Sequence, residues 1–127
     1  MKKTIATQNA PQALGPYAQA VQANNFVFTS GQLPVDPATG SFAGTTIKEQ
    51  TQQSLKNVQA VLDEAGCSMS DIVKTTVFLS DMNNFAAMNE VYAQFFTDGA
   101  FPARSAVQVA RLPKDALVEI EAVAVKQ

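Results

Sequence analysis

The 127-residue chain contains no histidine and one cysteine, Cys67. Without histidine, neither a Ser-His-Asp nor a Cys-His catalytic arrangement can be built, and the usual zinc ligand sets are excluded. Cys67 follows a predicted helix with no basic neighbour to lower its thiol pKa, so we interpret it as a structural residue. No glycine-rich phosphate-binding loop is present. Any chemistry must therefore use Arg, Glu, Tyr, Ser, Asn, backbone groups and water.

Positive charge is also scarce. The formal net charge is −2, and the only arginines are Arg104 and Arg111. A nucleic-acid-binding surface must neutralise a dense line of phosphates, so we expect no nucleic-acid partner. No stretch is apolar enough for a signal peptide or a membrane span. These absences favour a cytoplasmic protein that does not bind a membrane.

What is present is typical of a folded protein. The hydrophobic fraction of 46% and the chain length predict one globular domain over residues 1–127. A T-x-x-E capping box at Thr46 and Glu49 begins the first predicted helix, and Asn84 is the expected N-cap of the second. Hydrophobic periodicity predicts strands at 17–22, 26–30, 72–80, 104–109 and 117–125, with helices at 47–65 and 84–96. The order ββαβαββ indicates an α+β fold, with two helices packed on one face of a mixed sheet.

The most informative stretch lies near the C-terminus, FPARSAVQVARLPKDALVEIEAVAVKQ. Side chains on a strand alternate between two faces, so Arg104 shares a face with Ala106 and Gln108. In the last strand Glu119 and Glu121 share a face. We predict that the two strands pair as an antiparallel hairpin, with Ala106 opposite Glu119 and Arg104 opposite Glu121.

The opposite parity would place Arg104 among the apolar residues of the other face, Val118, Ile120 and Ala122. Burying a charge there is strongly disfavoured, so we expect Arg104 and the two glutamates to share one face of the sheet. The simple alternative is an ion pair on a solvated face, worth under about 1 kcal/mol. The same face also carries Leu117 and Val123, and two helices can cover only the other face. An exposed apolar patch predicts an oligomer, with the charged residues near a subunit interface.

Five segments together span nearly the whole chain: IATQNAPQALGPYAQAV, FTSGQLPVDPATG, DIVKTTVFLSDMNNFAAMNEVYAQFF, FPARS and VARLPKDALVEIEAVAV. They resemble the Rid family of reactive-intermediate deaminases (YjgF/L-PSP), in its RidA/TdcF branch. The combination of SGQ, FPARS and ARLPKDxxxEIE is highly specific for that family.

This resemblance implies a chorismate-mutase-like α+β fold and a homotrimer with ligand sites in the clefts between subunits. It also implies hydrolysis of imines and enamines such as 2-iminobutanoate, 2-iminopropanoate and 2-aminoacrylate to 2-oxo acids and ammonia. Pyridoxal-phosphate-dependent dehydratases release these compounds from threonine and serine. The implied chemistry needs no cofactor and no metal, because an imine carbon is already electrophilic.

The family motifs also imply residue roles. Arg104 of FPARS would bind the substrate carboxylate, which its planar guanidinium suits. Glu119, the first glutamate of VEIE, would orient or deprotonate the attacking water. By position alone Glu121 is an equal candidate, and only the motif selects Glu119. A nearby Arg104 would keep Glu119 in its charged form.

Further residues would line the same cleft by resemblance. They are Tyr17 of GPY, Ser30 and Gly31 of TSG, and Asn89 of the second helix. Ala106 stands where family members usually carry cysteine after FPARS. Because the implied mechanism is direct attack by water, Ala106 is expected to keep a backbone contact with the substrate and to lack only the thiol.

Two other classes of function stay open on the sequence. One is a non-catalytic trimer that binds small carboxylates as a sensor through the same Arg104. The other is a ribonuclease or translation inhibitor, which the acidic balance and the absence of histidine disfavour.

Overall fold

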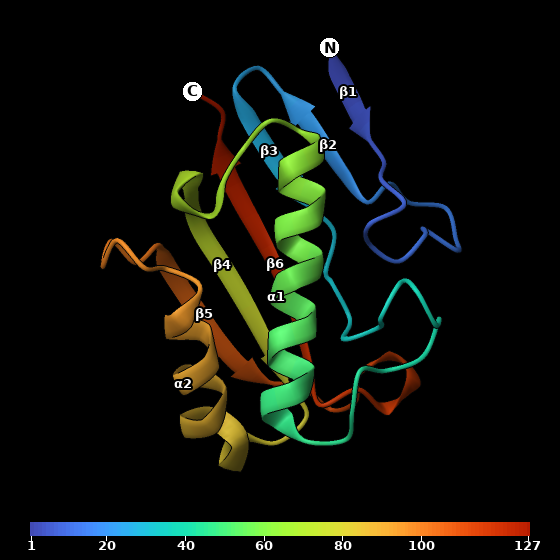
Figure 1. The fold of residues 1–127 in the computed structure, drawn as a ribbon, viewed down its shortest axis with the longest axis vertical. Helices are drawn as coiled ribbons and strands as arrows, with labels where there is room; N and C mark the ends of the chain where they lie inside the picture. Colours follow the sequence, from blue (N-terminus) through green and yellow to red (C-terminus); the bar gives the residue numbers. More distant parts are fainter.

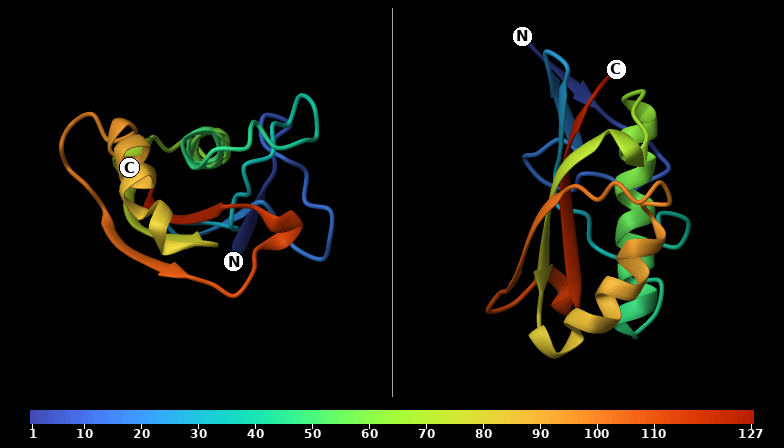
Figure 2. Two further views of the ribbon diagram at one scale, coloured as in Figure 1. Left: turned by 90° about the horizontal axis from the view of Figure 1, so that it is seen from below. Right: turned by 90° about the vertical axis from the view of Figure 1, so that its left-hand side faces the viewer.

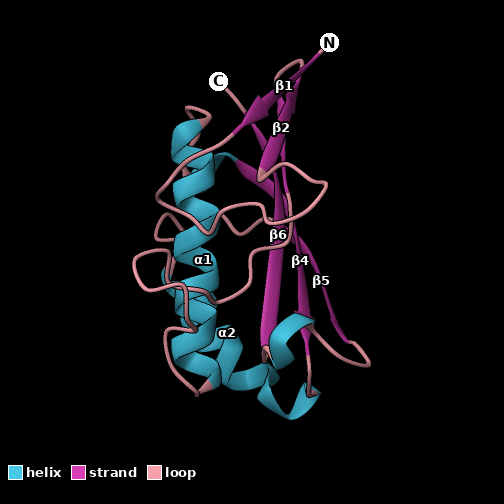
Figure 3. Ribbon diagram, turned by 90° about the vertical axis from the view of Figure 1, so that its right-hand side faces the viewer, coloured by secondary structure: helices cyan, strands magenta, loops and turns pink.

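The computed structural model describes residues 1–127 and consists of one six-stranded sheet with both α-helices on one of its faces (Figures 1 and 2). The strand order is β1-β2-β3-β6-β4-β5. Figure 3 shows the two layers edge-on, with α1 and α2 on the same side of all the strands. The elements are β1 Lys2–Ile5, β2 Ala20–Ala23, β3 Phe26–Thr29, α1 Ile47–Glu64, β4 Ile72–Leu79, α2 Phe85–Gln94, β5 Ala103–Gln108 and β6 Val118–Val125.

The α+β class and the ββαβαββ order are confirmed, with one strand added at the N-terminus. That strand, β1, pairs antiparallel with β2 along the edge of the sheet. Its sequence KKTI is short, and three of its four side chains are exposed. No alternating apolar pattern was therefore available to predict it.

Helix α1 follows its sequence signals closely. The Thr46 hydroxyl accepts a hydrogen bond from the backbone N–H of Glu49 at 3.2 Å, and the Glu49 carboxylate accepts one from the Thr46 N–H at 3.3 Å. This is the predicted capping box. Gly66, at φ +82°, follows the helix in the left-handed conformation that ends helices. Asn84 precedes α2 but makes no side-chain capping bond.

The predicted C-terminal hairpin is wrong, because β4 lies between β5 and β6. Strand β5 pairs parallel with β4, and β6 pairs antiparallel with the other edge of β4. Helix α2 connects β4 to β5, and a crossover of this kind produces parallel neighbours. Strand β4 has β6 on one side and β5 on the other.

The predicted shared face is wrong for the same reason. Thr75 of β4 is opposite both Arg104 and Ala122, so Arg104 lies on the helix-covered face. Phe78 is opposite Glu119, which therefore lies on the open face. The argument from burial failed because β5 is an edge strand. Arg104 there meets α2 rather than the apolar residues of β6.

The open face of the sheet carries exposed apolar side chains, as expected. Phe26, Phe28 and Val107 are 45%, 43% and 44% exposed. Glu119 and Val123 lie on this face, whereas Leu117 precedes β6. In a single chain nothing covers this surface. No helix of the protein has the length and apolar character needed to cross a membrane.

Candidate functional site

The Arg104 side chain projects from β5 toward α2 and makes one hydrogen bond within the chain. Its Nη1 donates to the Asn89 side-chain oxygen at 2.7 Å. The guanidinium carbon lies 4.8 Å from the centre of the Tyr92 ring and 5.4 Å from that of Phe85. No carboxylate lies within 4 Å of it, since the two ion pairs of the chain are Lys48–Glu90 and Arg111–Asp115. The remaining guanidinium N–H groups are therefore available to bind an anion.

We call Arg104, Asn89, Tyr92 and Phe85 the arginine half-site. Asn89 projects from α2 beside the buried residues Met88 and Tyr92. Ala106 lies on the same face of β5, two residues from Arg104, and packs against the hydrophobic core. Tyr92 and Phe85 lie in the predicted second helix and had no expected role in the site. Sequence spacing did not reveal that they contact Arg104.

Glu119 has different surroundings. A Cβ atom placed on Gly31 would lie 2.6 Å from Glu119 Oε2, so the carboxylate packs directly against the backbone of Gly31. Burial raises the pKa of the Glu119 carboxyl above its usual range, and the charge of Glu121 raises this pKa further. Arg104 was expected to favour the charged form, but within one chain it lies on the other face of the sheet.

Ser30 and Tyr17 lie next to Gly31. The Ser30 hydroxyl donates to the Ala18 carbonyl at 2.6 Å, and the Ser30 N–H donates to the Gln19 carbonyl at 2.8 Å. These bonds hold the segment that carries Tyr17, whose side chain is exposed. We call Glu119, Gly31, Ser30 and Tyr17 the glutamate half-site.

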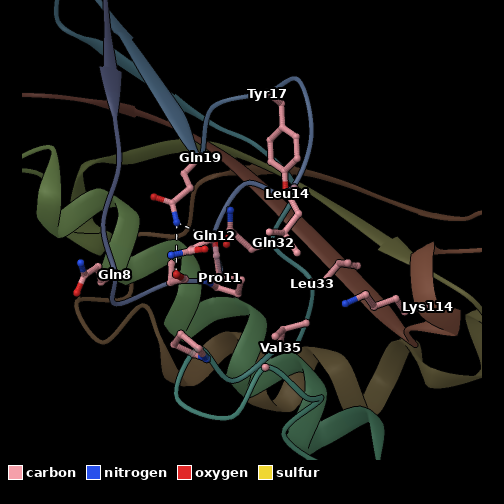
Figure 4. Close-up of a pocket in the computed structure, with 14 residues that line it drawn as sticks. Gln8, Pro11, Gln12, Leu14, Tyr17, Gln19, Gln32, Leu33, Val35 and Lys114 are labelled. Carbon is pink, nitrogen blue, oxygen red and sulfur yellow. Dashed lines mark hydrogen bonds between the residues drawn. The ribbon is translucent and has the colours of Figure 1, made fainter.

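Tyr17 and Gly31 also line a cavity of about 530 Å³ (Figure 4). Its wall includes Gln19 and Gln32, and its only charged lining residue is Lys114. The Gln19 amide donates to the Pro11 carbonyl at 2.7 Å and holds the N-terminal loop in place. These three residues had no expected role, and local sequence does not show that Lys114 adopts φ +56° beside the cavity.

One chain thus brings the predicted site residues together in two groups. Arg104, Asn89 and Ala106 lie on the helix-covered face at one edge of the sheet, whereas Glu119 lies on the open face against Gly31. No cluster of three or more His, Cys, Asp or Glu side chains could hold a metal ion. The arrangement provides an anion-binding group and a carboxyl group with a raised pKa, on opposite faces of the sheet.

Comparison with known proteins places the chain in a family. The model described as endoribonuclease L-PSP matches residues 7–126. The chain belongs to this L-PSP family. Among its L-PSP relatives, the 2-iminobutanoate/2-iminopropanoate deaminase of Salmonella typhimurium is 56% identical over the full length of both chains. The enzyme of the same name from Escherichia coli is 54% identical, also over the full length of both.

Solved structures of L-PSP proteins have the same fold. Escherichia coli TdcF, crystallised with bound serine, superposes with a TM-score of 0.94 at 53% identity and covers 98% of this chain and 99% of its own. The Escherichia coli YjgF gene product superposes with a TM-score of 0.95 at 54% identity, with the same coverage. The six-stranded mixed sheet with two helices on one face is therefore the fold of the family.

Proposed function

We propose that this protein is a deaminase that hydrolyses 2-iminobutanoate and 2-iminopropanoate to the 2-oxo acids and ammonia. The observation that carries the proposal is Arg104, a guanidinium placed between two aromatic rings with no carboxylate partner in the chain. Such a group is ready to bind the carboxylate of a small substrate. The full-length similarity to enzymes of this name supports the choice of substrate.

We further propose that three copies assemble so that the arginine half-site of one copy faces the glutamate half-site of the next. Two observations support this assembly. The groups lie on opposite faces of the sheet within one chain, so they cannot cooperate there. The open face exposes Phe26, Phe28 and Val107, and association would remove this apolar surface from water. The family resemblance supplies the number three.

In this assembly Arg104 binds the substrate carboxylate and Asn89 holds the guanidinium in place. Water attacks the imine carbon while Glu119 accepts a proton from it, which gives a tetrahedral carbinolamine. Glu119 then returns this proton to the amino group, because a carboxyl beside the reacting atoms can act first as base and then as acid. Ammonia then leaves as the carbinolamine hydroxyl gives its proton to the restored carboxylate of Glu119, and the carbonyl of the 2-oxo acid forms. The enamine 2-aminoacrylate enters the same path after protonation at its methylene carbon.

The remaining predicted residues shape the cleft. Gly31 lets the carboxylate of Glu119 lie against the backbone, and Ser30 holds the segment that carries Tyr17. Ala106 offers the backbone of β5 beside Arg104. The step uses only protein groups and water. Its substrates are supplied by pyridoxal-phosphate-dependent dehydratases, and a cytoplasmic location stays a prediction from the sequence.

A coupled assay tests the function. Threonine dehydratase generates 2-iminobutanoate, and the rate of 2-oxobutanoate formation is followed with semicarbazide competing for the imine. Addition of the protein should increase the rate, and Arg104→Ala should abolish the increase. Arg111→Ala is the matched control, because Arg111 is exposed and bonded to Asp115. Full activity of Arg104→Ala would contradict the proposed anchor.

Two alternatives make different predictions. A sensor would bind small carboxylates, as serine binds to TdcF, but would not accelerate imine hydrolysis. A ribonuclease, the activity in the family description, would cleave RNA through Glu119-independent chemistry. The net charge of −2 and the absence of histidine disfavour RNA cleavage. RNA cleavage that persists in repurified Glu119→Ala protein would favour that alternative.

A further inference from the structure

The ring of Tyr92 lies beneath Arg104 and is held from two sides. Tyr92 is only 4% exposed, and its hydroxyl lies 2.6 Å from the hydroxyl of Thr75, which is fully buried on β4. Thr75 is directly opposite Arg104 in the sheet. The ring of Phe96 packs against Tyr92, with 4.9 Å between the ring centres. The hydrogen bond and the packing together fix the position of the Tyr92 ring.

The surroundings of Arg104 leave its charge unneutralised. A carboxylate partner would hold the guanidinium firmly but would compete with the substrate carboxylate. An aromatic face attracts a cation without occupying its N–H groups. Burial raises the pKa of the Tyr92 hydroxyl, so Tyr92 stays neutral beside the guanidinium. Arg104 is thus oriented by its neighbours and open to an anion.

We propose that Tyr92 is a positioning residue for Arg104 and that its hydrogen bond to Thr75 sets the orientation of the ring. This inference rests on the proposed function, in which Arg104 binds the substrate carboxylate. Asn89 accepts one hydrogen bond from the guanidinium. This single bond would not by itself restrict rotation along the rest of the long arginine side chain. Placing the guanidinium on a fixed ring removes that freedom before the substrate arrives, which lowers the entropic cost of binding.

Steady-state kinetics of the whole protein provide the first test. Tyr92→Met keeps an apolar side chain of suitable length but removes the aromatic face and the hydroxyl. We expect KM for 2-iminobutanoate to rise about tenfold, with kcat changed less than about threefold, because the lost interaction positions the substrate-binding group. Tyr92→Phe keeps the ring and should return KM to within about threefold of the parent value.

Val27→Ala is the matched control, because Val27 is fully buried in the same hydrophobic core but lies on β3, two strands from β4 in the sheet. A purely structural role for Tyr92 predicts equal changes in KM for Tyr92→Met and Val27→Ala, and that result would overturn the inference. Thr75→Val replaces the hydroxyl by a methyl group of similar size. It should raise KM about two- to threefold, and an unchanged KM would exclude the role of Thr75.

Arginine side-chain NMR gives a readout that does not depend on catalysis. The chain has two arginines, so the Nε–H signal of Arg104 is identified by its persistence in Arg111→Lys. The ring current of Tyr92 should displace the Arg104 signal, and Tyr92→Met should remove this displacement while the Arg111 signal stays in place. An unchanged Arg104 signal would overturn the inference even if the parent is active. An inactive parent with the displaced signal would instead refute the proposed function.

Discussion

The surroundings of the ionisable group differ between the arginine half-site and the glutamate half-site. At the edge formed by β5 and α2, Arg104 is surrounded by neutral groups that attract a cation without neutralising it. On the open face, burial and the charge of Glu121 both act against the charged form of Glu119. Within one chain, one environment leaves a positive charge open to an anion, whereas the other favours the protonated form of a carboxyl. Each half-site lacks what the other provides.

The largest predicted effect comes from combining two defective proteins. Arg104→Ala and Glu119→Gln should each be inactive alone. Refolded together from denaturant, they should recover about a quarter of the parental activity, because random mixing leaves about one cleft in four with both intact residues. The coupled 2-oxobutanoate assay measures the recovery.

The control mixes Arg104→Ala with the double variant Arg104→Ala/Glu119→Gln, which offers no intact arginine and should stay inactive. Failure of the first mixture to recover activity, with mixed oligomers confirmed by mass spectrometry, would show that the two half-sites do not meet across a subunit interface.

Gly31→Ala should damage the glutamate half-site alone. The new Cβ would overlap Oε2 of Glu119 at 2.6 Å and displace the carboxylate, and a displacement of this size can reduce kcat/KM by about 10- to 100-fold. Gly15→Ala is the control, because its Cβ would meet the Tyr17 ring at an ordinary 3.6 Å. In Gly31→Ala, the affinity of Arg104 for a small carboxylate, measured by calorimetry, should decrease by a smaller factor than kcat/KM. Equal activity of the two variants would exclude the proposed position of Glu119.

The pH profile should report the raised pKa of Glu119. Because Glu119 acts first as a base, kcat/KM should rise with pH through an apparent pKa above the ordinary glutamate value. Glu121→Gln removes the neighbouring charge, so this limb should move to lower pH. The folded protein favours the protonated carboxyl of Glu119. Its contribution to the free energy of unfolding should therefore be lost as pH rises from the ordinary glutamate pKa through the raised pKa of the folded state. An unshifted limb in Glu121→Gln would show that Glu119 does not control the rate.

The smallest effect is expected for the scaffold that both half-sites share. Thr46→Ala removes the capping box of α1 and should lower the free energy of unfolding by about 1 kcal/mol. The pH profile and KM should not change, because Thr46 is exposed and contacts neither half-site. Urea denaturation followed by circular dichroism measures the loss, and Thr46→Ser, which keeps the hydroxyl, should show almost none.

Local signals predicted most of the fold. The two helices and the capping box of α1 depend on residues close in sequence, and the structure confirms them. The pairing of β5 was wrong because period-two alternation shows which side chains share a face within a strand. It does not show which strands are neighbours. Insertion of β4 between β5 and β6 reversed the expected relation of Arg104 to Glu119.

The candidate site divides in the same way. Motif resemblance selected Arg104, Glu119, Tyr17, Ser30, Gly31, Asn89 and Ala106, and their roles stay predictions. Tyr92 and Thr75 were missed because a tyrosine and a threonine at buried positions look like ordinary core residues until the sheet places them beside Arg104. Glu119 was expected to be kept charged by Arg104, and only the three-dimensional arrangement showed that its neighbours are Gly31 and Glu121.

Residue types and their spacing were sufficient to establish the chemistry open to this protein. A chain without histidine and with a single cysteine has only its arginines, carboxylates, hydroxyls and amides with which to act. The tertiary structure decided which of these groups meet, because the order of strands depends on contacts between residues far apart in the chain. A crossover through α2 placed Arg104 on one face of the sheet and left Glu119 on the other.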